Sequence, residues 1–528
     1  MGRFRNLDAI SSYANLFITI ISALILIPII ESNVGKNYYG IYQFILTLAI
    51  YSEMISLGLG KTVERYVAKY SAEHNKDLES AAVSITLFIY MITAAVFFAG
   101  AGVLTWQFGN IFNFRGSELD VARLSFVIAA FNAGLNVIAS LFWCHLRGRA
   151  RFSFVYNLFT ANALLRVPLF ILLLRAGHGI VTLFLVDLIL AQSINLVYAS
   201  VSIITYRLNI KLFYFDKALF KKFFQFTVFI FLGGIGNLLY WNADNIILAI
   251  FTNAEIIAEY ALSQRLLDYF FRYSIAFSGL FLPQFMANYM AKGQHLQNSA
   301  LADLFTRSSR VMGILMSFAI VNFLVLGRDF IVLWIGPHYP MTFVYAAIIL
   351  VPYWLVLSQS TGTEMMYVMK RHKVIALIYL GTALVNIAAT VYLVQRIGPI
   401  GAAISTGATL LVGVFLLGNL YFRHLLQLNL LDHFKAVFLK NALVSVVVLM
   451  YGFGLNQVIT RVSVVNFIGK GMLLNLIFIP LIYLVFLTRD ERRAIRIRIS
   501  AYREQLKTLI TKRPGSGEIM PGSKEQER

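Results

Sequence analysis

Residues 11–30 read SSYANLFITIISALILIPII, a stretch without a single charged side chain. At 1.5 Å per residue, a helix of this length spans the hydrocarbon core of a bilayer, which is about 30 Å thick. The stretch follows Arg3 and Arg5, and it is longer than the apolar segment of a cleavable signal peptide. We therefore expect it to be retained as the first membrane span.

The rest of the chain is equally apolar. Of its 528 residues, 59% are hydrophobic and only 13% are charged, about half the charged share of soluble domains. Mean hydropathy is +0.73. A soluble globular protein and a disordered chain are both excluded. The composition predicts an all-α polytopic membrane protein with about 14 transmembrane helices. The spans are expected at about 10–30, 38–60, 82–106, 121–143, 154–175, 180–205, 223–251, 257–283, 308–327, 341–367, 374–395, 399–420, 436–457 and 463–487.

Lys and Arg are distributed unevenly among the connections between these spans. If the N-terminus is inside, the inside segments hold 34 of the 45 Lys and Arg, and the outside loops hold six. Because positive residues favour the cytoplasmic side, the bias predicts that both termini are cytoplasmic. It also explains most of the net charge of +20 without a nucleic acid partner. The outside loops have at most about 13 residues, which excludes a large extracytoplasmic catalytic domain and argues against an enzyme.

An internal repeat is indicated when the sequence is compared with itself at an offset of 218 residues, because Tyr42 then aligns with Tyr260. Each tyrosine lies near the start of the second span of a six-span unit. Two such units with the same orientation form a parallel repeat, with a substrate path at their interface. We predict an N-terminal six-helix lobe at 1–210, a C-terminal six-helix lobe at 211–428, two additional transmembrane helices at 429–488 and a basic cytoplasmic tail at 489–528. Apolar residues in the tail recur with helical spacing from 495 to 509, which fits an amphipathic helix on the inner leaflet or a solvated charge run.

Ionisable residues inside a span cost about 2.5–3.5 kcal/mol on insertion scales, so they usually face a cavity or a partner. The span at 257–283 carries Arg265, Asp268 and Arg272 with spacings that place them on one helical face. Two cations there share one acid. The surplus cation favours an anionic ligand, because guanidinium groups suit phosphate oxygens.

Other buried charges match one another in depth. Asp244 and Arg265 lie at similar distances from the outer side, as do Arg166 and Asp187 in the first half. Each pair is either part of a substrate path or a structural lock between helices. Anion binding is assigned to Arg166, Arg265 and Arg272. The candidate ion-coupling or charge-pair acids are Glu53, Asp187, Asp244, Asp268 and Glu364.

No other chemistry is expected. The single cysteine, Cys144, excludes a disulfide framework, and the eight histidines lack zinc-ligand spacing. Gly60-Lys61-Thr62 lacks the glycine that a phosphate-binding loop needs five residues earlier. We therefore expect no catalytic residue, no metal site and no cofactor beyond a possible coupling H⁺ or Na⁺. Lys470, near the outer end of the last span, is expected to extend to the membrane surface.

Several short motifs, by their order and spacing, resemble bacterial oligosaccharide/polysaccharide flippases, a branch of the multidrug/oligosaccharidyl-lipid/polysaccharide exporter superfamily. These motifs are ISLGLG at 55–60, VERY at 63–66, EYAL at 259–262 with RL at 265–266, LWIG at 333–336 and GPIGAA at 398–403.

The resemblance covers about residues 7–485 and implies two six-helix lobes around a central cavity plus two extra helices. It implies alternating access that moves an undecaprenyl-diphosphate-linked oligosaccharide from the inner to the outer leaflet of the bacterial cytoplasmic (inner) membrane. Implied partners are the lipid-linked oligosaccharide, membrane lipids, and glycan polymerase and assembly proteins. Lipid II flippases of the superfamily carry an Arg in the first span, whereas residues 11–30 have none. The glycan is left open.

Two alternatives and the driving force are also left open. A drug/cation antiporter of the same superfamily would favour an acidic cavity, which the surplus of Arg opposes. A scaffold without transport would not need charged spans. An inside-negative potential favours outward movement of a diphosphate by roughly 4–5 kcal/mol per 100 mV. Either this potential or a coupling ion at one of the acids is expected to drive transport.

Overall fold

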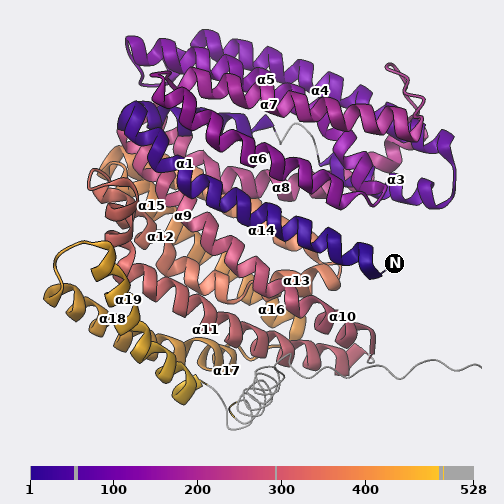
Figure 1. Ribbon diagram of the computed structural model, residues 1–528. Coiled ribbons are helices and arrows are strands. Elements are labelled where there is room, and N and C mark those ends of the chain that lie inside the picture. Colours follow the sequence, from indigo (N-terminus) through magenta and orange to yellow (C-terminus); the bar gives the residue numbers. More distant parts are fainter. Residues whose placement is uncertain (1, 53–57, 292–293, 487–491, 493–528) are drawn as a thin grey trace, which may run out of the picture.

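The computed structural model describes residues 2–52, 58–291, 294–486 and 492, and every regular element in this part of the chain is helical. The long helices lie roughly side by side in one bundle (Figure 1). Eleven of the described helices are long and apolar enough to cross a membrane. The prediction of an all-α polytopic membrane protein is confirmed, and the number fourteen stays a prediction. The predicted amphipathic helix at 495–509 and nearly all of the tail lie outside the described residues.

The difference between eleven and fourteen has a simple origin. Helix α1 (Gly2–Ile50) contains two predicted spans that meet at Gly35. Gly35 has φ 80° and a non-helical backbone conformation open mainly to glycine, so two helical segments meet there at a kink. Helix α8 (Lys217–Phe251) and the charge-rich helix α9 (Ala254–Ser278) cover two further predicted spans but are not among the eleven.

The N-terminal lobe is built from α1 and five further long elements. They are α3 (Leu59–Ala72), α4 (Lys76–Ile111), α5 (Ser117–Gly148), α6 (Phe152–Arg175) and α7 (Ile180–Ser200), which continues into a π-helical turn at Val201–Thr205. Helices α4, α5 and α7 form the upper edge of the bundle in Figure 1.

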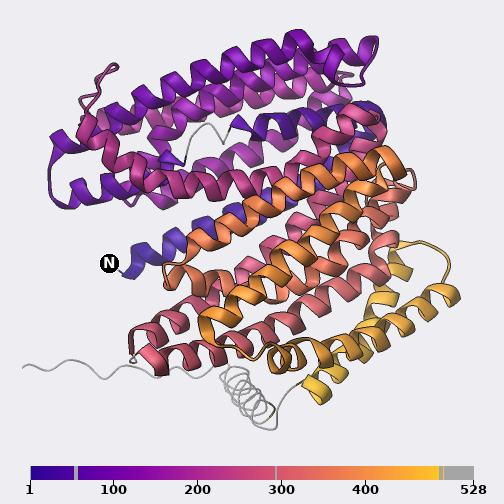
Figure 2. The ribbon, with the colours of Figure 1, turned by 180° about the vertical axis from the view of Figure 1, so that it is seen from behind.

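The C-terminal lobe contains α8, α9 and the helices that follow them. These are α10 (Leu282–Ala291), α11 (Gln294–Ile335), α12 (Pro340–Ser358), α13 (Thr361–Val368), α14 (His372–Ile397), α15 (Ile400–Thr409) and α16 (Gly418–Leu426), with a π-helical segment at Leu410–Leu417. Helices α17 (Leu430–Phe434), α18 (Lys440–Val458) and α19 (Val464–Leu481) follow. Helices α18 and α19 lie at the edge opposite α4 and α5 in both views (Figures 1 and 2).

The additional helices are joined to the C-terminal lobe by a buried ion pair. The Lys470 ammonium lies 2.7 Å from the Asp329 carboxylate on α11, and the Lys470 side chain is only 2% exposed. The prediction that Lys470 extends to the membrane surface is wrong. An acid on a neighbouring helix provides a partner inside the protein, so the lysine need not reach water.

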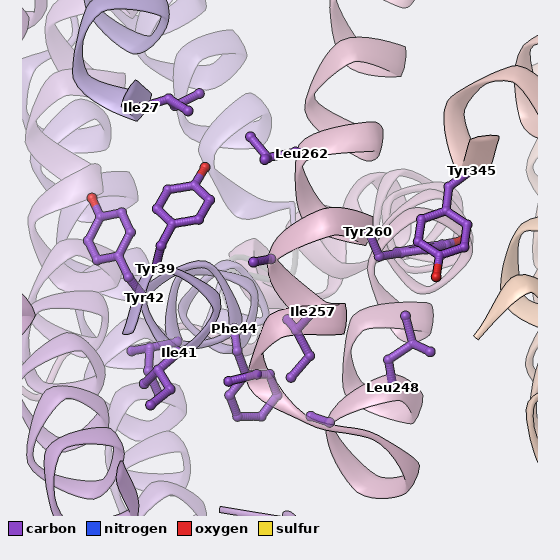
Figure 3. Close-up of a cluster of buried hydrophobic side chains, with 14 of the residues drawn as sticks. Ile27, Tyr39, Ile41, Tyr42, Phe44, Leu248, Ile257, Tyr260, Leu262 and Tyr345 are labelled. Carbon is purple, nitrogen blue, oxygen red and sulfur yellow. The ribbon is translucent and has the colours of Figure 1, made fainter. Parts of the chain in front are cut away.

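The two lobes approach closely at the end of the bundle opposite the N-terminus, which the predicted topology makes the outer end. Helices α1 and α9 pack together there, and a Cβ on Gly40 would collide with the Ala254 carbonyl. A large apolar cluster fills the contact. In Figure 3, Phe44 of α1 lies beside Ile257 of α9, whereas Tyr42 is directed away from α9.

The inner end holds polar contacts that fasten the helices there. Thr62 of α3 and Thr227 of α8 are hydrogen bonded at 2.7 Å. Inside the N-terminal lobe, the buried carboxylate of Glu79 accepts hydrogen bonds from His145 at 2.9 Å and from Arg149 at 2.6 Å. These contacts link α3 with α8 across the lobes, and α4 with α5 inside the N-terminal lobe.

Candidate functional site

Two cavities meet at the boundary between the lobes and share one wall. The larger, of about 830 Å³, extends from this boundary into the N-terminal lobe. The smaller, of about 510 Å³, lies against α8, α9 and α12. Residues of α1, α8 and α9 line both cavities. These shared residues are Leu46, Ile50, Gly234, Leu238 and Arg265.

Arg265 is the charged residue at this junction. It is half-buried on α9 and lines both cavities. Within the described part of the chain, its guanidinium has no hydrogen bond or ion pair to a protein group. A half-buried guanidinium without a protein acceptor is a ready donor for an anionic group that enters either cavity.

The predicted cluster on α9 is split by a local ion pair. Arg272 donates to Asp268 across one helical turn, with 2.7 Å between Nε and Oδ2. Both side chains are partly exposed to the smaller cavity, which they line together with Arg265. Asp268 is therefore paired with Arg272. The surplus positive charge inferred from the sequence lies on Arg265.

Arg166 and Asp187 meet in the N-terminal lobe, as their matched depth suggested. The Arg166 guanidinium lies 2.7 Å from the Asp187 carboxylate and 2.8 Å from the Tyr42 hydroxyl. It also stacks over the Phe170 ring at 4.7 Å. Both charged residues line the larger cavity, and the arginine side chain remains 31% exposed. The contact joins α6 to α7 and to the second half of α1, and it leaves Arg166 accessible from the cavity.

Asp244 does not pair with Arg265, so that predicted contact is wrong. The Asp244 carboxylate is fully buried and accepts hydrogen bonds from three hydroxyl groups instead. The donors are Tyr260 at 2.5 Å, Thr406 at 2.6 Å and Thr390 at 3.0 Å. These hydroxyls come from α9, α14 and α15 of the same lobe. They can stabilise a buried carboxylate without a cation, since each donates one hydrogen bond to it.

Tyr42 and Tyr260, the residues that marked the repeat, hold corresponding places. Tyr42 binds the fifth-span residue Arg166, and that arginine binds Asp187 on the sixth span. Tyr260 binds Asp244, which also binds the fifth and sixth spans of its own lobe through Thr390 and Thr406. Figure 3 shows the two tyrosines on different helices, with Tyr260 directed away from α1 toward Tyr345. The repeat is therefore visible in the polar contacts of each lobe.

The two remaining predicted acids are Glu53 and Glu364. Glu53 lies outside the described residues. Glu364 is half-buried on α13, and it lines neither cavity.

The amide side chains of the cavities were missed by the sequence reasoning. The larger cavity is lined by Asn132, Asn136, Asn162 and Asn195, and the smaller by Gln43, Asn237, Asn242 and Asn245. The signal was present in the sequence. Asn132 and Asn136, one helical turn apart in an apolar span, indicate a polar stripe on one face. Ionisable residues alone do not reveal this stripe, because amides carry no charge.

An ion pair that was not predicted from the sequence lies at the outer end of the site. Lys36 of α1 donates to Glu259 of α9 at 2.6 Å. The sequence places Lys36 in a loop between two predicted spans, and a loop position does not indicate a partner in the other lobe.

The family profile described as "Polysaccharide biosynthesis protein" matches residues 8–287 of the chain, more than half of its length. The chain belongs to this family. The match covers the N-terminal lobe from residue 8 onward, together with α8 and α9, the helices that carry Asp244 and Arg265. None of the curated proteins matches the chain.

Solved structures show the same fold at low identity. Lipid II flippase MurJ in an inward closed conformation is 14% identical, with a TM-score of 0.68 over 90% of this chain and 97% of that one. An inward-facing multidrug resistance MATE family transporter of the MOP superfamily is 13% identical, with a TM-score of 0.65 over 79% and 99%. A MOP superfamily transporter from Pyrococcus furiosus is 14% identical, with a TM-score of 0.55 over 80% and 96%. This polysaccharide biosynthesis family protein therefore has the fold of MOP-superfamily transporters.

Proposed function

We propose that the protein is a flippase that moves an undecaprenyl-diphosphate-linked oligosaccharide from the inner to the outer leaflet of the bacterial cytoplasmic membrane by alternating access. The observation that carries this proposal is the position of Arg265. Its guanidinium has no described protein partner and lies where the two cavities between the lobes meet. A diphosphate bound there would receive charge-assisted hydrogen bonds, which are among the strongest in proteins.

The family and the fold support the same proposal. The chain belongs to a polysaccharide biosynthesis family, and one of the structures that it resembles is a lipid II flippase. Lipid II itself is a less suitable substrate, because the first span carries no arginine between residues 11 and 30. Under this proposal the chain is a carrier and performs no covalent chemistry.

The second candidate is a drug/cation antiporter, because the chain also has the fold of a multidrug resistance transporter. The charges of the cavities disfavour it. Asp187 is paired with Arg166, and Asp268 is paired with Arg272. A cationic drug would have to displace an arginine from one of these acids, whereas an anion finds Arg265 available.

Coupling to an ion is assigned to Asp244. Its carboxylate is surrounded by hydroxyl oxygens of Tyr260, Thr390 and Thr406, and oxygen donors of this kind suit H⁺ or Na⁺. The membrane potential adds roughly 4–5 kcal/mol per 100 mV for a ligand with two negative charges. The proposed cycle uses both sources of energy.

The test is deletion of the gene in its native host, followed by mass spectrometry of membrane lipids. We expect accumulation of a completed, unpolymerised repeat unit on undecaprenyl diphosphate, and its disappearance on complementation with the wild-type gene. Arg265→Ala should fail to complement although the protein inserts normally. Arg175→Ala, an exposed arginine at the end of α6, is the matched control and should complement. No accumulation while the glycan pathway is active would favour the antiporter.

A further inference from the structure

Four hydrogen-bonded amides, named here the amide cluster, are Asn132, Asn136, Gln192 and Asn195. All but Gln192 line the larger cavity. Gln192 donates to Asn132 at 2.8 Å, and Asn195 donates to Asn136 at 2.6 Å. Asn136 also donates to Asn132, and Asn195 to Gln192, each at 3.2 Å. The cluster joins α5 to α7 and holds each amide in a fixed orientation.

The cluster leaves two polar atoms unused. The Asn132 Nδ2 donor and the Asn195 Oδ1 acceptor have no partner among the described residues. Neither atom is buried, and both residues line the cavity. On the facing helix α6, Asn162 lines the same cavity, also without a described partner. The wall thus presents free donors and acceptors together, the arrangement that recognises hydroxyl groups, because each hydroxyl both donates and accepts.

The charged residues of the cavity lie nearer the outer end of the bundle than Asn162 and Asn195. Its charged lining residues, within the described chain, are Arg166, Asp187 and Arg265. Asn195 follows Asp187 by eight residues on α7, which places it about 12 Å further toward the inner end. Asn162 precedes Arg166 by four residues on α6, about 6 Å in the same direction. The cationic level and the neutral amide level can therefore be occupied by two parts of one ligand.

We propose that the amide cluster is a glycan subsite that binds the hydroxyl groups of an uncharged sugar attached to the diphosphate. The inference rests on the proposed flippase function and specifies its substrate: the sugar next to the diphosphate carries no carboxylate. A charged sugar would place its carboxylate against amides that offer hydrogen-bond donors but no cation, so the cost of its desolvation would be only partly offset.

The experiment measures the Kd of three probes for the full chain in lipid nanodiscs: undecaprenyl diphosphate, undecaprenyl diphosphoglucose and undecaprenyl diphosphoglucuronic acid. Glucose and glucuronic acid differ only at C6, where a carboxylate replaces the hydroxymethyl group. We expect the glucose probe to bind roughly 5- to 10-fold more tightly than undecaprenyl diphosphate, as one or two net hydrogen bonds would provide. The glucuronic acid probe should show no such gain.

The variants separate the subsite from the rest of the cavity. Asn132→Leu/Asn195→Leu, which keeps the branched shape of the side chain, should lose the preference for glucose and keep the Kd for undecaprenyl diphosphate. Asn162→Leu breaks no described hydrogen bond and should reduce the preference without disturbing the fold. Asn288→Leu, on exposed α10 outside both cavities, should behave as wild type.

Each contrary result has its own meaning. Equal binding of the glucose probe and undecaprenyl diphosphate by the wild type overturns the subsite, as does a preference that survives in both asparagine variants. A gain for glucuronic acid equal to that for glucose overturns the restriction to uncharged sugars. If the wild type binds none of the probes, the proposed flippase function itself fails, and the subsite fails with it.

Discussion

The Lys36 ammonium lies 2.6 Å from the Glu259 carboxylate and so joins the second spans of the two lobes at the outer end. The same ammonium donates to the His338 carbonyl at 2.8 Å, and the other Glu259 oxygen accepts from the Met341 amide at 2.6 Å. Only 19% of the lysine and 9% of the glutamate side chain is exposed. An outward-open state would have to separate this pair, so it stabilises the outer-closed state.

Reversing one charge of this pair should open the outer end more often. Lys36→Glu and Glu259→Lys each place like charges together, and we expect roughly tenfold faster labelling of Leu46→Cys by a membrane-impermeant maleimide, which corresponds to about 1.4 kcal/mol. Leu46 lines both cavities, and the background carries Cys144→Ala.

The double variant Lys36→Glu/Glu259→Lys should restore slow labelling, because it rebuilds the pair with opposite polarity. Labelling rates that do not change in either single variant would show that the pair has no effect on the outer gate.

Gly40 tests the same closure by steric means. A Cβ at this position would collide with the backbone of Ala254, so Gly40→Ala should oppose approach of the lobes and accelerate labelling of Leu46→Cys several-fold. Gly100→Ala on α4 is the matched control, because a Cβ there meets nothing within 4 Å. If both variants label alike, the close approach at Gly40 is not required for closure.

The Arg166–Asp187 pair should prove functional as well as structural. Asp187→Ala and Arg166→Ala are each expected to reduce export, measured as accumulated lipid-linked glycan in the complemented deletion strain. Removing both partners of a pair usually repairs the structural damage, since no unpaired charge remains. Because Arg166 also faces the cavity, the double variant should regain membrane abundance but not export. Recovery of export would reduce the pair to a lock between α6 and α7.

Asp244→Asn should uncouple transport from ions. In inverted membrane vesicles, wild-type transport of undecaprenyl diphosphoglucose should rise several-fold when a proton or Na⁺ gradient is imposed. The amide retains one acceptor for the hydroxyls of Tyr260, Thr390 and Thr406 but cannot be charged, so the variant should insert and lose this response. Asp120→Asn, an exposed acid at the start of α5, should respond as wild type. A gradient response that persists in Asp244→Asn would assign coupling to another group.

Much of the architecture could be predicted from the sequence, because hydrophobic length and the Lys/Arg bias are local properties. The contact of Arg166 with Asp187 could also be anticipated, since adjacent antiparallel helices bring residues of equal depth together. The partners of Asp244 could not, because Thr390 and Thr406 lie 146 and 162 residues away and are common apolar-span residues. Depth alone paired Asp244 with Arg265, although the two side chains point into different surroundings.

The spacing of Asn132 and Asn136 indicates a polar stripe, but the sequence does not show what that stripe faces. Asn132 and Asn195 lie on two helices whose rotation about their axes decides whether the side chains meet lipid, protein or a cavity. This rotation of each helix is set by its packing against neighbouring helices. The sequence of a weakly amphipathic span does not reveal which face packs against which neighbour.

The buried pair of Lys470 and Asp329 has a consequence for synthesis in the cell. The two residues are separated by 141 positions, so at 5–20 residues per second the ribosome needs roughly 7–28 s between them. During that interval Asp329 of α11 lacks the cation that it contacts in the complete protein. A chain interrupted before its last helix would keep this carboxylate without that partner. The ion pair can therefore form only after the last helix has been synthesised, which makes it one of the last contacts between helices to form.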